Sequence, residues 1–222
     1  MAAPTIIDEL ADFSACDCSD ALVKLGVAGG GFLPGPSMWS PQRQEGTTKV
    51  IGRAYTVRYA LLSSAEDKVP VHYIDTIPQG AAVVISAPST IPNAVYGGLM
   101  STRAQASGAA GTIVHGRVRD LHEHRALGYP VFASDVGTVS PYENAKVVAV
   151  NQKLELVSEY GTTIVEPGDI VVADIDGVVV IPRSVEDQII PLMIRQTQAD
   201  AKVAESIKAG MTFVEASKKH RV

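Results

Sequence analysis

The sequence predicts an α/β fold, and three observations support this prediction. Short runs rich in β-branched residues, separated by turn residues, dominate the middle and late chain and are typical of strands. Apolar residues at helical spacing occur near both ends of the chain and around residues 97–123. A chain of 222 residues with 46% hydrophobic residues can bury one sizeable core, so we expect a single domain over residues 1–222.

The composition excludes several classes of protein. A net charge of -5 leaves no basic surplus for a nucleic-acid surface. No apolar run approaches the roughly 18 residues of a membrane helix, and the N-terminal segment lacks a basic region followed by an apolar core. One residue separates Cys16 from Cys18, which suits neither a disulfide framework nor a zinc knuckle, so we expect reduced thiols. The sequence therefore predicts a cytoplasmic protein with no nucleic-acid partner and no membrane association.

Two short helices are expected near the N-terminus. Thr5 can cap the first helix, and either Asp17 or Ser19 can cap the second. Residues 27–46 are rich in glycine and proline, which predicts a long loop. That loop holds Trp39, the only tryptophan, whose ring could pin the loop to its own subunit or contact another subunit.

Local patterns predict the remaining elements. Strands are expected at 50–60, 81–85, 112–114, 130–133, 146–150, 154–157, 162–165, 170–172 and 178–181. Helices are expected around 71–77 and from 184 to about 209. The apolar run at 81–85 suits a strand covered on both faces. Asp176 and Gly177 predict a β-hairpin, so we interpret Asp174 and Asp176 as turn residues rather than metal ligands. His72 has no partner at ligand spacing and is interpreted as an ordinary half-buried or surface histidine.

The candidate site lies in the middle of the chain. Gly97 and Gly98 open a predicted helix that stops at Ser107-Gly108. At this helix start the backbone N–H groups of Leu99 and Met100 are expected to be free, and Gly98 has no side chain to block a ligand. We therefore expect a cradle that receives a carboxylate.

Charged side chains follow at the start of a second predicted helix. Arg119 offers a planar fork for pairing with a carboxylate, and Asp120 offers a hard oxygen ligand for Mg²⁺ or Mn²⁺. Glu123 lies three residues after Asp120, so both carboxylates share one helical face. A zinc site with His122 and His124 is less favoured, because catalytic zinc sites use more nitrogen or thiolate ligands. A surface cluster of salt bridges is the other alternative.

At these residues the sequence resembles a known family. The spacing of Gly98, twenty intervening residues, Arg119-Asp120, two residues and Glu123 is similar to the signature of the RraA-like proteins. Segments 19–22, 167–174 and 176–178 are also similar to that family. The family includes metal-dependent 4-hydroxy-4-methyl-2-oxoglutarate aldolases and oxaloacetate decarboxylases. The resemblance implies a β/β/α swivelling-domain sandwich with flanking helices, assembled as a homotrimer or hexamer.

The resemblance also implies a function. It predicts a lyase that uses Mg²⁺ or Mn²⁺ to cleave a carbon–carbon bond in 2-oxo dicarboxylic acids through a pyruvate enolate. The expected catalytic residues are Arg119 and Asp120; the expected substrate-binding residues are Gly98, Leu99, Met100 and Arg119; the expected metal site is Asp120 with Glu123 acting through water. No Gly-x-Ser-x-Gly elbow, P-loop or dinucleotide fingerprint competes with this prediction.

One departure from the family pattern bears on the reaction. In the aldolase branch the position of Gly98 is an aspartate linked to the base that takes the proton of the 4-hydroxyl group. Glycine at this position favours oxaloacetate decarboxylation over retro-aldol cleavage of 4-hydroxy-4-methyl-2-oxoglutarate, because loss of CO₂ needs no such base. The alternative function is a non-catalytic RraA-like binding protein that regulates a ribonuclease or another partner.

Overall fold

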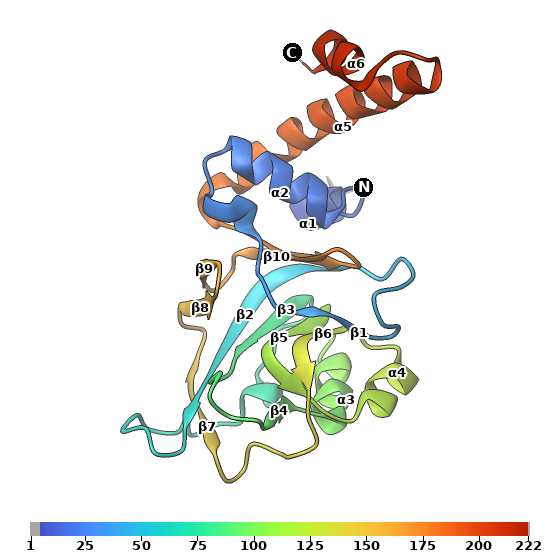
Figure 1. The fold of residues 1–222 in the computed structure, drawn as a ribbon. Helices are drawn as coiled ribbons and strands as arrows, with labels where there is room; N and C mark the ends of the chain where they lie inside the picture. Colours follow the sequence, from blue (N-terminus) through green and yellow to red (C-terminus); the bar gives the residue numbers. More distant parts are fainter. Residues whose placement is uncertain (1–4, 222) are drawn as a thin grey trace.

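The computed structural model describes residues 5–221 and confirms the α/β class (Figure 1). The α-helices are α1 (Ile6–Leu10), α2 (Ala15–Lys24), α3 (Gly98–Ala106), α4 (Leu121–Leu127), α5 (Glu186–Lys208) and α6 (Phe213–His220). Short 3-10 helices are η1 (Ala28–Gly31), η2 (Tyr73–Asp75) and η3 (Arg183–Val185). None of the helices within residues 5–221 combines the length and the apolar character that a bilayer crossing needs.

Nine strands of the described chain form one mixed sheet. They are β1 (Ser37–Ser40), β2 (Val50–Leu61), β3 (Ala81–Ser86), β4 (Ala94–Tyr96), β5 (Gly111–Val118), β6 (Val131–Val136), β7 (Ala145–Val150), β10 (Ile170–Asp174) and β11 (Gly177–Ile181). The order across the sheet is β1-β6-β5-β3-β2-β10-β11, while β4 pairs with β5 and β7 pairs with β2. A separate hairpin consists of β8 (Leu154–Ser158) and β9 (Gly161–Val165).

The centre of the sheet is parallel. β2, β3, β5 and β6 run in the same direction, with α3 before β5 and α4 between β5 and β6. Parallel neighbours require such crossover connections. Residues 81–85 of β3 are buried throughout, as their continuous apolar sequence predicts.

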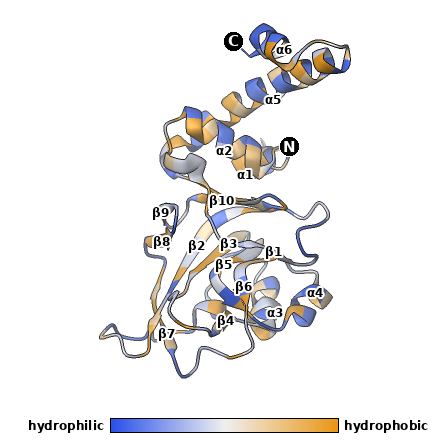
Figure 2. Ribbon diagram, viewed as in Figure 1, coloured by the Kyte–Doolittle hydropathy of each residue, from blue (hydrophilic) through white to orange (hydrophobic). Residues whose placement is uncertain are grey.

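Alternation along the strands divides the interior into three apolar clusters. Val83 and Val114 face the cluster that α3 and α4 cover, whereas Val84 and Ile113 face the opposite side of the sheet. There the sheet curls, so β10 and β11 close over the second cluster. The outer face of β10 and β11 packs against α1, α2 and α5 as the third cluster. Figure 2 shows hydrophobic residues along several strands and alternating with hydrophilic ones along these helices.

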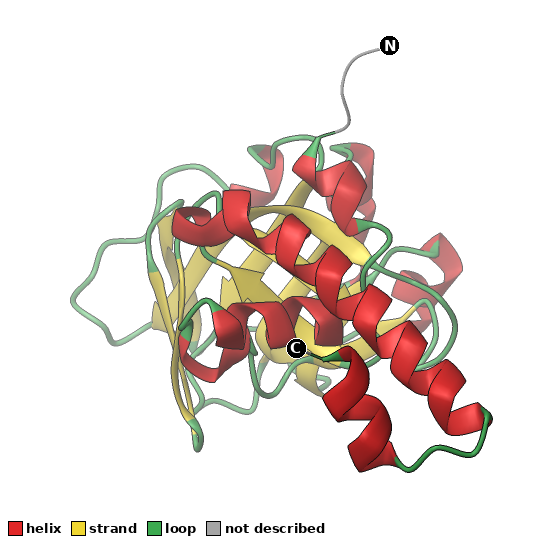
Figure 3. Cartoon of the chain, turned by 90° about the horizontal axis from the view of Figure 1, so that it is seen from above, coloured by secondary structure: helices red, strands yellow, loops and turns green. Residues whose placement is uncertain are grey.

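The C-terminal helices lie away from the candidate site. α6 folds back beside the distal part of α5, and both lie on the side of the molecule that holds α1 and α2 (Figures 1 and 3). Thr212 caps α6 in a reciprocal pair of hydrogen bonds with Glu215. The sequence predicted the long helix but did not anticipate α6.

Two local predictions for the N-terminal part of the chain were wrong: the residue that caps α2 and the loop at 27–46. Ser14 caps α2, and Asp17 completes its capping box from the third helical position, so neither Asp17 nor Ser19 is the cap. Segment 27–46 contains η1 and β1 rather than a loop alone. Trp39 lies in β1, and its indole N–H donates to the carbonyl of Ala133 at 3.0 Å. The ring therefore pins this segment to its own chain.

Other local predictions concern residues 71–77, the Asp176-Gly177 turn and the cysteines. Segment 71–77 forms only the 3-10 turn η2, since prolines at 70 and 78 bracket it. The predicted hairpin at Asp176-Gly177 is present between β10 and β11. Asp174 accepts the N–H of Asp176 at 3.0 Å and that of Ala15 at 2.8 Å, which confirms its structural role. Cys16 and Cys18 are free thiols.

Candidate functional site

The site forms where two neighbouring parallel strands end. β4 ends at Tyr96 and leads into α3, while β5 ends at Val118 and leads into Arg119 and Asp120. The N–H of Arg119 donates to the carbonyl of Tyr96 at 2.9 Å. This pairing brings the first turn of α3 beside residues that lie more than twenty positions later in the sequence.

Asp120 directs its carboxylate across to α3. Its backbone is left-handed, with φ 64° and ψ 41°, a conformation that aspartate tolerates better than most residues. The side chain makes no capping bond to its own helix α4. Instead Oδ2 accepts the N–H of Gly98 at 3.1 Å, and Nε of Arg119 lies 3.2 Å from Oδ1. The carboxylate is thereby fixed at the positive end of α3.

These contacts set the charge of Asp120. Burial raises the pKa of this carboxyl group, but the hydrogen bond from Gly98 and the guanidinium of Arg119 together lower it by more. The net pKa lies below the ordinary value for aspartate. Asp120 is therefore ionised at neutral pH, as a metal ligand must be.

Glu123 occupies the space beside Gly98. A Cβ atom placed on Gly98 would lie 1.8 Å from Oε2 of Glu123, and one placed on Gly97 would lie 2.6 Å from Oδ2 of Asp120. Each of the two consecutive glycines thus leaves room for one carboxylate. The space at Gly98 was expected to receive an external ligand, but the Glu123 side chain fills it.

Only one of the two backbone N–H groups that were expected to form the anion cradle is free within the described residues. The N–H of Met100 donates to the carbonyl of Gly97 at 3.0 Å, so it is not free. The first turn of α3 tightens in this way, as helix ends commonly do. Within residues 5–221, the N–H of Leu99 has no hydrogen-bond acceptor and remains open to a ligand.

A pocket of about 330 Å³ opens at this junction. Its lining includes the predicted residues Gly98, Leu99, Met100, Arg119 and Asp120. Glu123 is not part of the lining.

Other lining residues, among them Tyr59, His72 and Pro141, were not predicted from the sequence. His72 was interpreted as an ordinary histidine because no candidate partner lies near it in the sequence. Only the fold brings it to the wall of this pocket, so spacing offered no signal.

The donor set suits a cation that keeps most of its water. Within residues 5–221, no group of three or more histidine, cysteine, aspartate or glutamate side chains gathers as a metal cluster. Mg²⁺ is commonly bound through one or two carboxylates, with water and substrate as the other ligands. Asp120 and Glu123, placed against consecutive glycines, match that pattern.

The zinc alternative is not supported by the two histidines. The side chain of His122 is 84% exposed. His124 is fully buried and stacks on Tyr96, and neither of its ring nitrogens has a hydrogen-bond partner in the described chain. The two rings therefore do not converge with Glu123 on one metal position.

Comparisons with known sequences identify the family of this chain. A family model described as RraA-like: Aldolase/RraA matches residues 15–180, which include both glycines and both carboxylates. The chain is 31% identical over 217 residues to Protein DlpA of Legionella pneumophila; the match covers 96% of this chain but only 33% of DlpA. It is 28% identical over 157 residues to a Halalkalibacterium halodurans protein named "Putative 4-hydroxy-4-methyl-2-oxoglutarate aldolase", with coverage of 71% and 70%.

Solved structures have the same fold. An uncharacterized protein from Pseudomonas syringae pv. tomato matches with a TM-score of 0.80 at 28% identity, over 96% of this chain and 97% of that one. Streptomyces coelicolor RraAS2, described as an unusual member of the RNase ES inhibitor RraA protein family, matches with a TM-score of 0.73 at 23% identity, over 95% and 100% of the two chains. The β/β/α arrangement with flanking helices, expected from the sequence resemblance, is thus confirmed.

Proposed function

The chain belongs to the RraA-like family, and from this membership and its site we propose that it is a divalent-metal-dependent carbon–carbon lyase. The proposed substrates are 2-oxo dicarboxylic acids. One observation carries the proposal: Asp120 and Glu123 lie against two consecutive glycines at the start of α3, with Arg119 beside Asp120. A surface salt-bridge cluster would not need glycines opposite its carboxylates.

Mg²⁺ or Mn²⁺ is the proposed cofactor. Asp120 would be the direct ligand, because its carboxylate lines the pocket and is ionised at neutral pH. Glu123 would hold a water of the coordination shell, since it lies outside the pocket lining. When bound, the cation supplies a Lewis acid that stabilises negative charge on the 2-oxo oxygen.

Two groups of the chain would bind and orient the substrate. Arg119 contacts Asp120 only through Nε, so within residues 5–221 its two terminal nitrogens have no partner and present a fork to a carboxylate. The open N–H of Leu99 adds a donor at the positive end of α3. Both donors remain available as charge develops on the substrate oxygen, which is the condition for stabilising a transition state.

Decarboxylation of oxaloacetate is the favoured reaction. The bond between C3 and C4 breaks, CO₂ leaves, and the electron pair moves towards the 2-oxo oxygen to give the enolate of pyruvate. Retro-aldol cleavage of 4-hydroxy-4-methyl-2-oxoglutarate follows the same path but needs a base for the proton of the 4-hydroxyl group. Glycine at position 98 provides no such base.

Pyruvate release from oxaloacetate tests the proposal. The assay compares Mg²⁺, Mn²⁺ and a chelator, and it subtracts a blank without protein, because oxaloacetate loses CO₂ slowly by itself. We expect metal-dependent turnover that Asp120→Asn reduces to the blank. If the wild type releases no pyruvate from oxaloacetate or from 4-hydroxy-4-methyl-2-oxoglutarate, the lyase proposal is wrong and the binding-protein alternative is favoured. The single domain and the homotrimer or hexamer stay predictions that limited proteolysis and light scattering can check.

A further inference from the structure

A second hollow adjoins the candidate site. This side groove has a volume of about 780 Å³ and lies between the end of β2, segment 68–73 and segment 141–147. Three of its lining residues, Tyr59, His72 and Pro141, also line the pocket at Arg119 and Asp120. The two hollows therefore lie next to each other at these three side chains.

The side groove is lined mainly by apolar side chains. Three large ones are unusually open to water: Leu62 is 50% exposed, Val71 is 57% exposed and Tyr142 is 85% exposed. Single exposed hydrophobic residues are common, but several along one groove mark a surface that gains free energy when it is covered.

The charged residues of the groove do not oppose an anionic ligand. They are Lys68, Lys146 and Glu143, which together carry one excess positive charge. Lys146 is held by a hydrogen bond to the carbonyl of Ser64 at 2.8 Å, and Lys68 makes no ion pair within residues 5–221. This net positive charge does not repel a ligand that has an anionic carboxylate head and an apolar chain.

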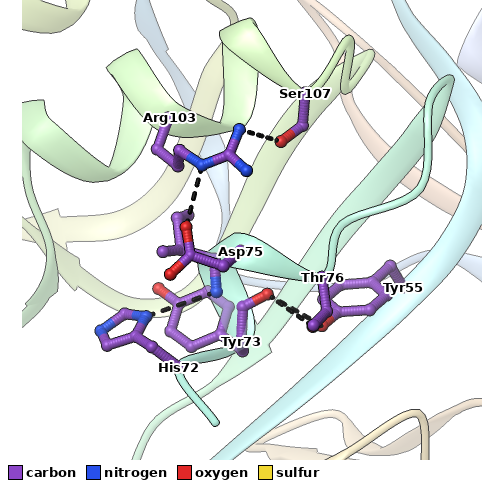
Figure 4. A network of polar contacts seen from close by, with 8 residues as sticks. Tyr55, His72, Tyr73, Asp75, Thr76, Arg103 and Ser107 are labelled. Atoms are coloured by element: carbon purple, nitrogen blue, oxygen red, sulfur yellow. Dashed lines mark hydrogen bonds and ion pairs between the residues drawn. The ribbon is translucent and has the colours of Figure 1, made fainter.

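The wall shared by the two hollows is held in place by polar contacts. Figure 4 shows that η2, next to His72, is tied to two other elements. The hydroxyl of Tyr55 in β2 donates to the carbonyl of Tyr73 at 2.9 Å. Arg103 of α3 donates through Nε to Asp75 at 2.9 Å. Because α3 also begins the candidate site, the wall and the site are positioned by the same helix, and a preformed groove loses little entropy when filled.

We propose that the side groove is a subsite for an apolar tail of the substrate. This inference rests on the proposed function and refines its substrate class to 2-oxo dicarboxylic acids that carry an alkyl or aryl chain on C3. Oxaloacetate is small enough to fit in the pocket of about 330 Å³ and leaves the side groove empty. A longer 2-oxo acid places its head at Arg119 and Asp120 and covers Val71 with its tail.

Binding of unreactive 2-oxo acids measures the contribution of the groove directly. 2-Oxooctanoate differs from pyruvate by five methylene groups, and each fully buried methylene strengthens binding about fourfold. Since the groove is open to solvent, partial burial is expected, and 2-oxooctanoate should bind about 10- to 100-fold more tightly than pyruvate. Isothermal titration calorimetry with Mg²⁺ present gives both dissociation constants without any turnover.

A pair of exposed valines provides the variant and its control. Val71→Ser removes apolar surface from the groove, whereas Val157→Ser makes the same change on the exposed face of β8, outside both hollows. Val71→Ser should weaken 2-oxooctanoate binding about three- to tenfold and leave pyruvate binding unchanged, and Val157→Ser should alter neither.

Three results would overturn the proposal. Equal affinities for pyruvate and 2-oxooctanoate in the wild type would show that the side groove is not a subsite, without contradicting the proposed function. The same conclusion follows if Val71→Ser has no more effect on 2-oxooctanoate than Val157→Ser. If the wild type binds neither 2-oxo acid, the proposed function fails together with the subsite.

Discussion

Replacing Gly98 by alanine tests the contact on which the candidate site depends. The new Cβ would lie 1.8 Å from Oε2, 2.5 Å from Cδ and 2.7 Å from Cβ of Glu123. Rotation of the Glu123 side chain relieves the first two contacts. It cannot relieve the third, because Cβ is fixed to the backbone of α4. Gly98→Ala must therefore displace the carboxylate and also move α3 and α4 slightly apart.

The size of the effect follows from two opposing contributions. Overpacking of this kind typically costs about 1–3 kcal/mol. Alanine gains up to about 1 kcal/mol over glycine within a helix, and less at the first helical position. We expect the free energy of unfolding to fall by about 1–2 kcal/mol. At this chain length each kcal/mol corresponds to a lower melting temperature of about 2–4 °C.

Four proteins complete the test: wild type, Gly98→Ala, Glu123→Ala and the double variant. Urea unfolding gives their stabilities, and calorimetric titration with Mn²⁺ gives their metal affinities. Glu123→Ala removes the carboxylate that the new methyl group meets, so the double variant should lose less stability than the sum of the single variants, by about 1 kcal/mol. Gly98→Ala alone should weaken Mn²⁺ binding. Additive stabilities would refute the packing of Glu123 against Gly98. Wild-type Mn²⁺ affinity in Gly98→Ala would refute the part of Glu123 in the metal site.

Three further predictions concern single side chains. Asp120→Asn should abolish Mn²⁺ binding, and it should also make the free energy of unfolding less sensitive to acid. The folded-state pKa of Asp120 is lowered, so its ionised form stabilises the fold at neutral pH. This contribution disappears as the pH falls through that pKa. Unfolding curves between neutral pH and about pH 3 check this, and an unchanged acid limb would contradict it. Arg119→Lys should lower kcat/KM for oxaloacetate while the melting temperature stays near wild type; a parallel loss of stability would instead support the surface salt-bridge alternative. Burial raises the pKa of Cys18 to about 12, so a thiol reagent at mildly alkaline pH should modify exposed Cys16 in the native protein and reach Cys18 only after unfolding in urea.

Features fixed by neighbours in the sequence could be predicted from it. Gly98 begins α3, the helix ends before Ser107 and Gly108, and Asp176-Gly177 forms the hairpin turn. Each depends on the conformations that a few consecutive residues allow. By contrast, β4 has only three residues and is defined by its pairing with β5, so no local pattern announces it. His72 reaches the pocket for the same kind of reason, because η2 is tied to β2 and α3 by distant residues.

The candidate site shows where sequence spacing stops being informative. The separation of Asp120 and Glu123 places both carboxylates near the start of one helix. It does not show that Asp120 is left-handed and turns away from that helix, or that Glu123 packs against α3. Both depend on how α3 and α4 meet. The sequence therefore permitted Gly98 to be interpreted as clearance for an external carboxylate, and the structure gives the same glycine a different partner.

The residues at positions 98 and 123 therefore constrain each other sterically. A side chain at 98 would enter the volume that the Glu123 carboxylate occupies, with no backbone dihedral involved, because neither Gly97 nor Gly98 has a left-handed φ. An aspartate introduced at position 98 as a base would have to displace Glu123 first. Gly98→Asp alone therefore exchanges one carboxylate for another and cannot isolate the role of the base. Combined with Glu123→Ala, it leaves one carboxylate beside Asp120, supplied from α3 instead of α4, and any gain in retro-aldol cleavage can then be assigned to position 98.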